Sequence, residues 1–298
     1  MRWARKLPEG RGSRTSYGPL TGQGTTIERS RTCSDMASSP EGTSRSPEEL
    51  SFISKLLQED LALTAPPVQV TYLDTRPAGP VEVGAPLPSV CSYFIAGREK
   101  VIAADRAAHE SCEIGAFVLG IPPKGTLGSR LGSTVEFFER VGYLAHGEAA
   151  RIPRNPHPPS WVLYAPLGGA SQAPSVVLFT VSARGLMLVV ESTTRGEPGL
   201  PPAPLLARPM CGLVPVLLSG TPVAISVGCA GSRVHTGMRD DEVMVGVRGD
   251  ALMALADRVH QLRRANELVW KEEASRRSDF LQIQGASPAR TVAPPRPA

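Results

Sequence analysis

Strand-like and helix-like segments follow one another along this chain in no regular order, and that mixture limits the folds open to it. Val176 to Val181 is short, apolar and rich in β-branched residues, which is typical of a buried strand. Val68 to Leu73 has the alternation of a second strand. Because the strands and helices do not follow the repeating βαβ order of a parallel sheet, the sequence predicts an α+β fold. We expect a mixed sheet with flanking helices and a long C-terminal helix from Ala251 to about Arg277.

The first helix has the clearest start signal. Ser46 can cap it, Pro47 suits the first helical position, and Glu49 completes a capping box. The residues Glu82 to Val90 are expected to be extended, and helical spacing predicts a helix over Thr134 to Leu144. Further short strands are predicted at residues 101–104, 161–165, 224–227 and 243–247, and further apolar helices at 112–120, 183–191 and 211–218.

The two ends of the chain differ from this folded part in composition. Residues 1–45 are rich in Gly, Ser, Thr and Arg without hydrophobic periodicity, so we predict a disordered tail. The hypothesis that translation starts at Met36 would make residues 1–35 a mis-assigned leader, and an organelle transit peptide is the alternative. We expect a single folded domain at residues 46–277 and a disordered Pro/Ala-rich tail at 278–298.

Charge and hydropathy exclude several classes of function. Residues 1–35 hold seven basic and three acidic side chains, so the net charge of +4 resides there and the remainder is neutral. A neutral body has no basic surface for nucleic acid, so no nucleic-acid partner is expected. No apolar run of about 18 residues suggests a membrane span, and no secretory signal opens the chain. We therefore predict a cytoplasmic protein whose thiols are reduced.

Four cysteines are the main candidate site: Cys91, Cys112, Cys211 and Cys229. They lack the CxxC spacing of zinc ribbons and thioredoxin-like sites. Cys112 and Cys211 each precede an apolar run, so helices there would place both thiols at N-termini, where the helix dipole lowers a thiol pKa. Cys229 lies between Gly228 and Gly231, where missing side chains would let the backbone approach a ligand.

These residue types leave three functions open. Thiolates near free backbone N–H groups suit an iron–sulfur cluster or another soft metal, with Arg98 or Arg233 balancing the charge and a redox partner implied. Alternatively, the cysteines are reduced, buried and metal-free, and the turn from Gly228 to Arg233 contacts a small molecule or anion. The third function is a thiol enzyme with His109 or His235 as base. The sequence contains no phosphate loop, dinucleotide fingerprint or nucleophile elbow.

The order of several motifs resembles a known family. These motifs are Pro67-Val-x-Val70, Cys91 before Ala96-Gly-Arg98, Cys112-x-x-Gly115 with Leu119-Gly120, Tyr164-Ala-Pro166, Cys211, and Gly228-Cys-x-Gly-x-Arg233 followed by Asp241-Glu242. The chain resembles the bacterial and archaeal domain-of-unknown-function family 169 over roughly residues 46–264. The resemblance implies that the four cysteines, Arg233 and Glu242 occupy motif positions. It brings no assigned activity, and it favours a shared thiolate site.

Overall fold

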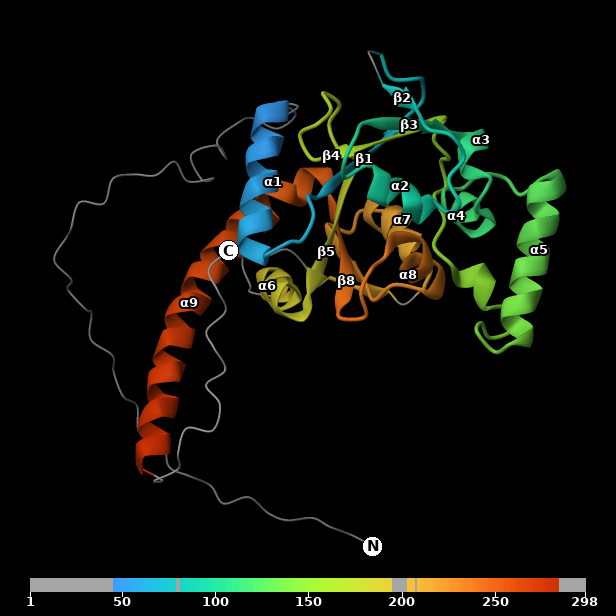
Figure 1. Cartoon of the computed structure of the whole chain (residues 1–298). Helices are drawn as coiled ribbons and strands as arrows, with labels where there is room; N and C mark the ends of the chain where they lie inside the picture. Colours follow the sequence, from blue (N-terminus) through green and yellow to red (C-terminus); the bar gives the residue numbers. More distant parts are fainter. Residues whose placement is uncertain (1–44, 79–80, 195–202, 207, 284–298) are drawn as a thin grey trace, which may run out of the picture.

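Within residues 45–78, 81–194, 203–206 and 208–283, which the computed structural model describes, eight strands form one mixed sheet (Figure 1). The strands are β1 (Val68–Leu73), β2 (Glu82–Val83), β3 (Ile102–Asp105), β4 (Trp161–Pro166), β5 (Val176–Ser182), β6 (Leu205–Leu206), β7 (Val223–Ser226) and β8 (Glu242–Arg248). Their order across the sheet is β2-β3-β4-β1-β5-β8-β7-β6. Neighbours are antiparallel except at the two edges, where β2 pairs with β3 and β6 with β7 in parallel. The predicted α+β class is confirmed.

Helices cover both faces of this sheet (Figure 1). They are α1 (Pro47–Leu61), α2 (Val90–Ala96), α3 (Arg106–His109), α4 (Glu113–Val118), α5 (Gly125–Arg140), α6 (Ala183–Thr194), α7 (Leu213–Leu218), α8 (Ala230–Thr236) and α9 (Leu252–Ile283). Short 3₁₀ turns are η2 (Glu148–Arg151), η3 (Met210–Gly212) and η4 (Gly249–Ala251).

The buried strand β5 divides the interior into two cores. Val176 and Leu178 face one core, together with residues of α2, α4, η3 and α7. Phe179 and Val181 point to the opposite face and pack with α1, α6 and the first half of α9. Because both faces of β5 are covered, its sequence is a continuous apolar run rather than an alternating one.

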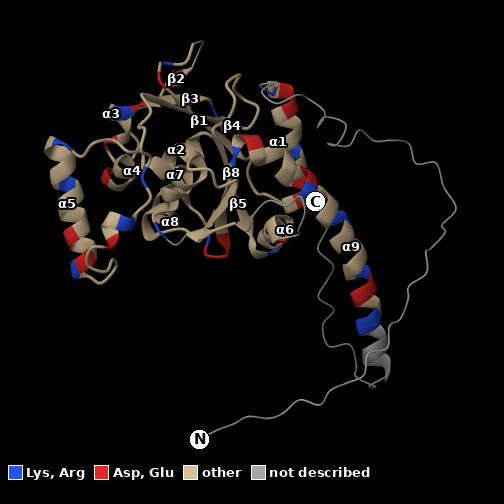
Figure 2. Ribbon diagram, turned by 180° about the vertical axis from the view of Figure 1, so that it is seen from behind, with Lys and Arg blue, Asp and Glu red and all other residues tan. Residues whose placement is uncertain are grey.

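The helices α1 and α9 pack side by side on the second core (Figure 1). The Ser46 side chain accepts the Glu49 N–H and the Glu49 carboxylate accepts the Ser46 N–H, which confirms the predicted capping box. Asp60 near the end of α1 accepts hydrogen bonds from His260 and Arg263 of α9, each at 2.9 Å. Beyond Leu262, α9 extends away from the body, and basic and acidic residues alternate along it (Figure 2).

Several helices differ from the sequence predictions. The structure forms α5 over Gly125–Arg140 rather than over residues 134–144, and Leu127 is its one buried residue. Of the segment Glu82 to Val90, which was predicted to be extended, only Glu82–Val83 form a strand, and Ser89 caps the short helix α2, which contains Cys91. No helix among the described residues is long and apolar enough to span a bilayer.

Candidate functional site

The four cysteines line a single cavity of about 430 Å³. Cys91 lies in the first turn of α2, Cys112 is the N-cap of α4, Cys211 lies in η3 just before α7, and Cys229 is the N-cap of α8. These elements are distant in sequence, but α2 contacts α4, η3 and α8. The fold therefore brings together four thiols that the sequence could only propose as a group.

Local sequence explains how two of these cysteines are held. The Cys112 Sγ accepts the Gly115 N–H at 3.3 Å, and the Cys229 Sγ accepts the Ser232 N–H at 3.4 Å. A side chain at Gly115 would collide with Val90 of α2, so the glycine of the Cys112-x-x-Gly115 motif lets α4 approach α2. Gly228 has a φ of 85°, which favours glycine and turns the chain from β7 into the cap of α8.

The opposite wall of the cavity is apolar. It comes from α5 and the segment that follows it, and it includes Phe137, Phe138, Val141, Leu144 and Ile152. Phe137 and Phe138 lie in α5, whose bounds differ from those predicted, and Leu144 and Ile152 follow it, so the relation of this wall to the cysteines was not predicted. The one signal in the sequence was the adjacent pair of phenylalanines in a predicted helix.

Polar side chains on the cavity wall are few. Arg208 lies over the Tyr143 ring at 4.5 Å and is paired with Glu148 at 3.5 Å. Thr134 donates to Glu113 at 2.6 Å. Arg208 is the one arginine that lines this cavity among the described residues, but its charge is paired with Glu148, and Glu113 brings a negative charge to the same wall.

The electrostatics of the thiols differ from the expectation for helix N-termini. Burial raises the pKa of Cys112. The pKa of Cys211 is raised strongly, first by its hydrogen bond with the Cys91 side chain, then by burial and by the charges of the neighbouring cysteines. The predicted lowering was wrong for these two residues, because burial at Cys112, and the Cys91 hydrogen bond together with burial at Cys211, outweigh the dipole of such short helices. Both thiols therefore keep their protons at neutral pH unless a bound metal ion displaces those protons.

The arrangement does not suit one metal ion. Among the residues with a described position, no three His, Cys, Asp or Glu side chains are grouped so that they could hold a metal ion. Two thiolates on one ion must lie within about 4.6 Å of each other, because each metal–sulfur bond is about 2.3 Å long. A [4Fe–4S] cluster binds each of its four cysteines through a different iron atom, so it takes thiolates that are further apart.

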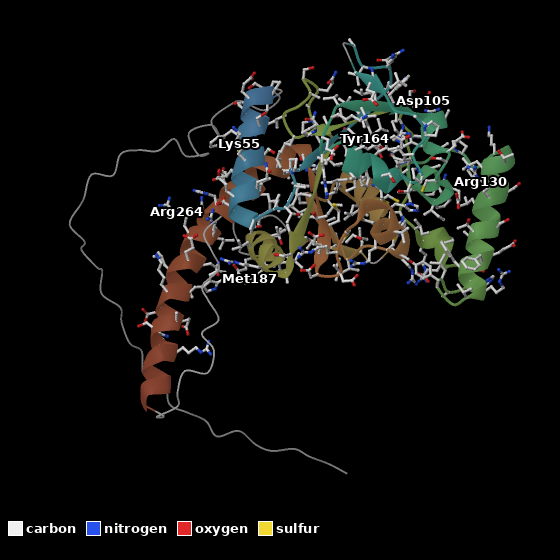
Figure 3. All side chains as sticks on the ribbon, viewed as in Figure 1. Lys55, Asp105, Arg130, Tyr164, Met187 and Arg264 are labelled. Atoms are coloured by element: carbon white, nitrogen blue, oxygen red, sulfur yellow. The ribbon has the colours of Figure 1, made fainter. Side chains whose placement is uncertain are left out.

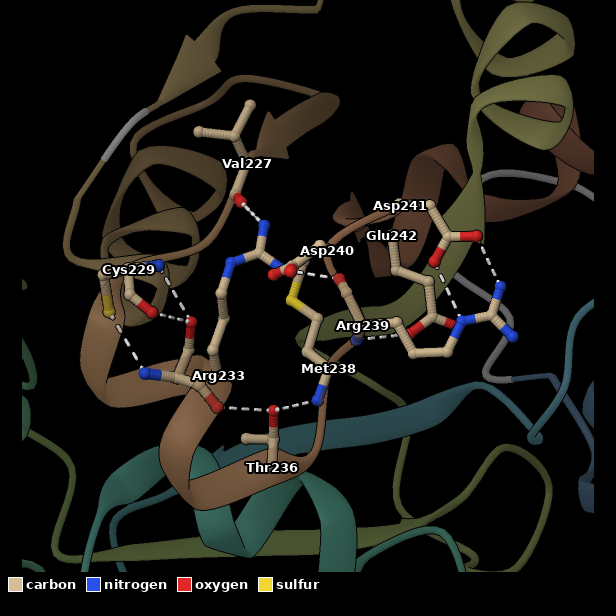
Figure 4. A network of polar contacts seen from close by, with 10 residues as sticks. Val227, Cys229, Arg233, Thr236, Met238, Arg239, Asp240, Asp241 and Glu242 are labelled. Atoms are coloured by element: carbon tan, nitrogen blue, oxygen red, sulfur yellow. Dashed lines mark hydrogen bonds and ion pairs between the residues drawn. The ribbon is translucent and has the colours of Figure 1, made fainter.

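The other predicted site residues are placed as follows. Gly231 lines the cysteine cavity, and Gly228 lies beside it in the turn. Arg233 donates to the backbone carbonyls of Val227 and Arg239 and is paired with Asp240, so its guanidinium closes a turn (Figure 4). Arg98 does not line the cysteine cavity; it lines a second, more polar cavity.

The two histidines considered as bases occupy different environments. His235 is exposed and lines the cysteine cavity. His109 is 1% exposed, and both of its ring nitrogens are engaged, by the Asp105 carbonyl and by the Tyr164 hydroxyl at 2.8 Å. Tyr164 lies near the centre of the body (Figure 3). His109 is therefore unavailable as a base for a thiol in the cavity.

Comparison with known proteins gives the family. The sequence model of the uncharacterised ArCR family, DUF169, matches residues 56–258. The chain belongs to this family. The DUF169 match spans every residue that lines the cysteine cavity, so the site is part of the DUF169 region. Neither the curated proteins nor the solved structures contain a match.

Proposed function

We propose that this DUF169 protein binds a polynuclear iron–sulfur cluster through Cys91, Cys112, Cys211 and Cys229 and exchanges electrons with a redox partner. The observation that carries the proposal is the convergence of four cysteines, from four separate segments, on one cavity. Four thiolates are the usual ligand set of [2Fe–2S] and [4Fe–4S] clusters.

The surroundings of the sulfurs support a cluster. Backbone N–H groups donate to the sulfurs of Cys112 and Cys229, and such hydrogen bonds stabilise a cluster's negative charge.

The test is anaerobic purification of the full chain, followed by iron, zinc and acid-labile sulfide analysis and a visible spectrum. We expect iron and sulfide in equal amounts and a visible absorption band that bleaches on reduction. Serine variants at each of the four cysteines should lose most of the iron and of the band, because a hydroxyl is a poor ligand for iron in a cluster. Cys33→Ser is the matched control, since Cys33 lies outside the described residues and in the predicted tail, and it should keep the full iron content.

A second candidate function follows from the opposite wall. A cavity of about 430 Å³ is within the range of small-molecule sites, and Phe137, Phe138 and Leu144 would hold an apolar ligand while the thiols stay protonated. A colourless, metal-free, folded protein after anaerobic purification would contradict the cluster and favour this candidate.

A further inference from the structure

A second cavity, of about 230 Å³, lies at the end of the central strands on the face that carries α2 and α8. Its wall is polar, unlike that of the cysteine cavity. It combines two arginines, one glutamate and three threonines, namely Arg98, Arg239, Glu242, Thr64, Thr180 and Thr236.

Arg98 enters this cavity with most of its hydrogen-bonding capacity unused. It follows Gly97, the C-cap of α2, and donates from Nη2 to the Thr180 hydroxyl at 3.3 Å. Among the described residues, no carboxylate lies within 4.0 Å of its guanidinium. A guanidinium has five N–H donors, so Arg98 can still bind an acceptor. Burial lowers the pKa of Arg98, and the Glu242 charge opposes that change.

Glu242 is the complementary group on the same wall. It is 9% exposed, and its carboxylate accepts the Arg239 backbone N–H at 2.9 Å (Figure 4). The Arg239 guanidinium, which also lines this cavity, is bound to Asp241. In the described part of the chain, no cationic side chain forms an ion pair with Glu242.

Two opposite charges thus line one cavity without touching. Partly buried opposite charges attract strongly at contact, so a direct pair would be the expected arrangement if the cavity had no occupant. A simple anion would bind Arg98 but would be repelled by the Glu242 carboxylate. A simple cation would bind Glu242 but would be repelled by the Arg98 guanidinium. A ligand with both charges satisfies both groups.

We propose that this cavity binds a small zwitterion of the α-amino acid type, with its carboxylate on Arg98 and its ammonium group on Glu242. The planar fork of an arginine matches a carboxylate in bidentate fashion. The Thr236 hydroxyl is engaged by the Ser232 carbonyl and the Met238 N–H, but the Thr180 hydroxyl, which accepts from Arg98, can still donate its proton to the ligand carboxylate. The cavity of about 230 Å³ is smaller than the usual range for drug-sized ligands, which limits the occupant to a small molecule.

The test measures the melting temperature of the full chain with each of the twenty proteinogenic amino acids, and isothermal calorimetry of any that raise it. We expect at least one amino acid to raise the melting temperature saturably. Acetate and ethylammonium, which carry one charge each, should not reproduce the effect. Because the cavity is separate from the cysteines, the result should be the same for protein with and without metal.

Two charge-removing variants locate the binding. Arg98→Gln and Glu242→Gln should each weaken the amino acid at least about tenfold, because each removes a charged hydrogen-bond partner. Arg130→Gln and Glu59→Gln, on exposed helix surfaces, are the matched controls and should keep full affinity. If a glutamine variant does not fold, Arg98→Lys keeps the charge but loses the planar fork, and it should still weaken binding.

Three results would overturn the proposal: no response to any amino acid, a response that survives both substitutions at Arg98 and Glu242, or an equal response to acetate alone. None of these results bears on the iron content of the protein, so the cluster and the zwitterion site fail or succeed separately.

Discussion

Acid should destabilise this protein through one buried histidine, His109. Its Nδ1 faces the Asp105 backbone carbonyl, which can only accept, so Nδ1 carries the proton. Nε2 then accepts the Tyr164 hydroxyl at 2.8 Å. Protonating Nε2 would place a charge at a site that is 1% exposed and would leave two donors facing each other until Tyr164 reorients.

The magnitude follows from the shift in pKa. Burial lowers the pKa of His109 to about 4, although Asp105 opposes the change. The unfolded chain has the ordinary value of about 6.5. Because the pKa of His109 is lower in the folded state than in the unfolded state, the stability that the neutral His109 contributes is fully present above about pH 6.5. This contribution is lost as the pH falls towards 4. A difference of about 2.5 units corresponds to about 3 kcal/mol, which is a large share of the 5–15 kcal/mol that stabilises a typical domain.

The assay is urea unfolding at intervals from pH 7 to pH 4, with wild type compared with His109→Gln. We expect the difference in unfolding free energy between them to shrink by about 3 kcal/mol over this range. His157→Gln, which removes an exposed imidazole, is the control and should follow wild type throughout. A difference that stays constant with pH would refute the reasoning. If His109→Gln does not fold, NMR titration of the wild-type imidazole decides, and a His109 pKa of 6 or above would contradict the burial argument.

Two further substitutions test individual contacts. The Tyr72 hydroxyl is buried without a hydrogen-bond partner in the described structure. Tyr72→Phe should therefore leave the free energy of unfolding unchanged, or raise it by up to about 1 kcal/mol, in urea titrations. A decrease of more than about 1 kcal/mol in that free energy would show that the hydroxyl has a partner. Asp60→Asn removes the carboxylate that binds both His260 and Arg263. It should lower the unfolding free energy by about 1–3 kcal/mol, less than for a fully buried pair because both partner side chains are about one-third exposed and can be hydrated. Exposed Asp74→Asn is the control, and equal effects of the two substitutions would contradict this expectation.

Much of the secondary structure was predictable because its signals are local. The capping box at Ser46 needs residues that are three apart, and the strand Val68–Leu73 is read from alternation within six residues. The apolar run from Val176 predicted β5 to within one residue. The absence of a regular βαβ order was enough to predict a mixed sheet.

The short helices α2 and α8 were missed, and they hold two of the four cysteines. Each has fewer than two full turns of apolar periodicity, too little for a pattern to be seen. The cap of α8 is Cys229, a residue type outside the usual N-cap set, although Ser89 before α2 was a readable signal. The bounds predicted for α5 were also wrong, because its first half contains three glycines and few apolar residues at helical spacing.

The sequence by itself therefore determined the class of the fold, most of its strands, and the identity of the four cysteines as one candidate group. Tertiary structure alone decided that these cysteines share one cavity and that Arg98 and Glu242 line another without touching. The physical reason is that a strand or a cap depends on neighbours along the chain, whereas a cavity depends on how helices from distant segments pack on one sheet. The same packing reversed the expected direction of the thiol pKa values, since burial is a property of the whole fold.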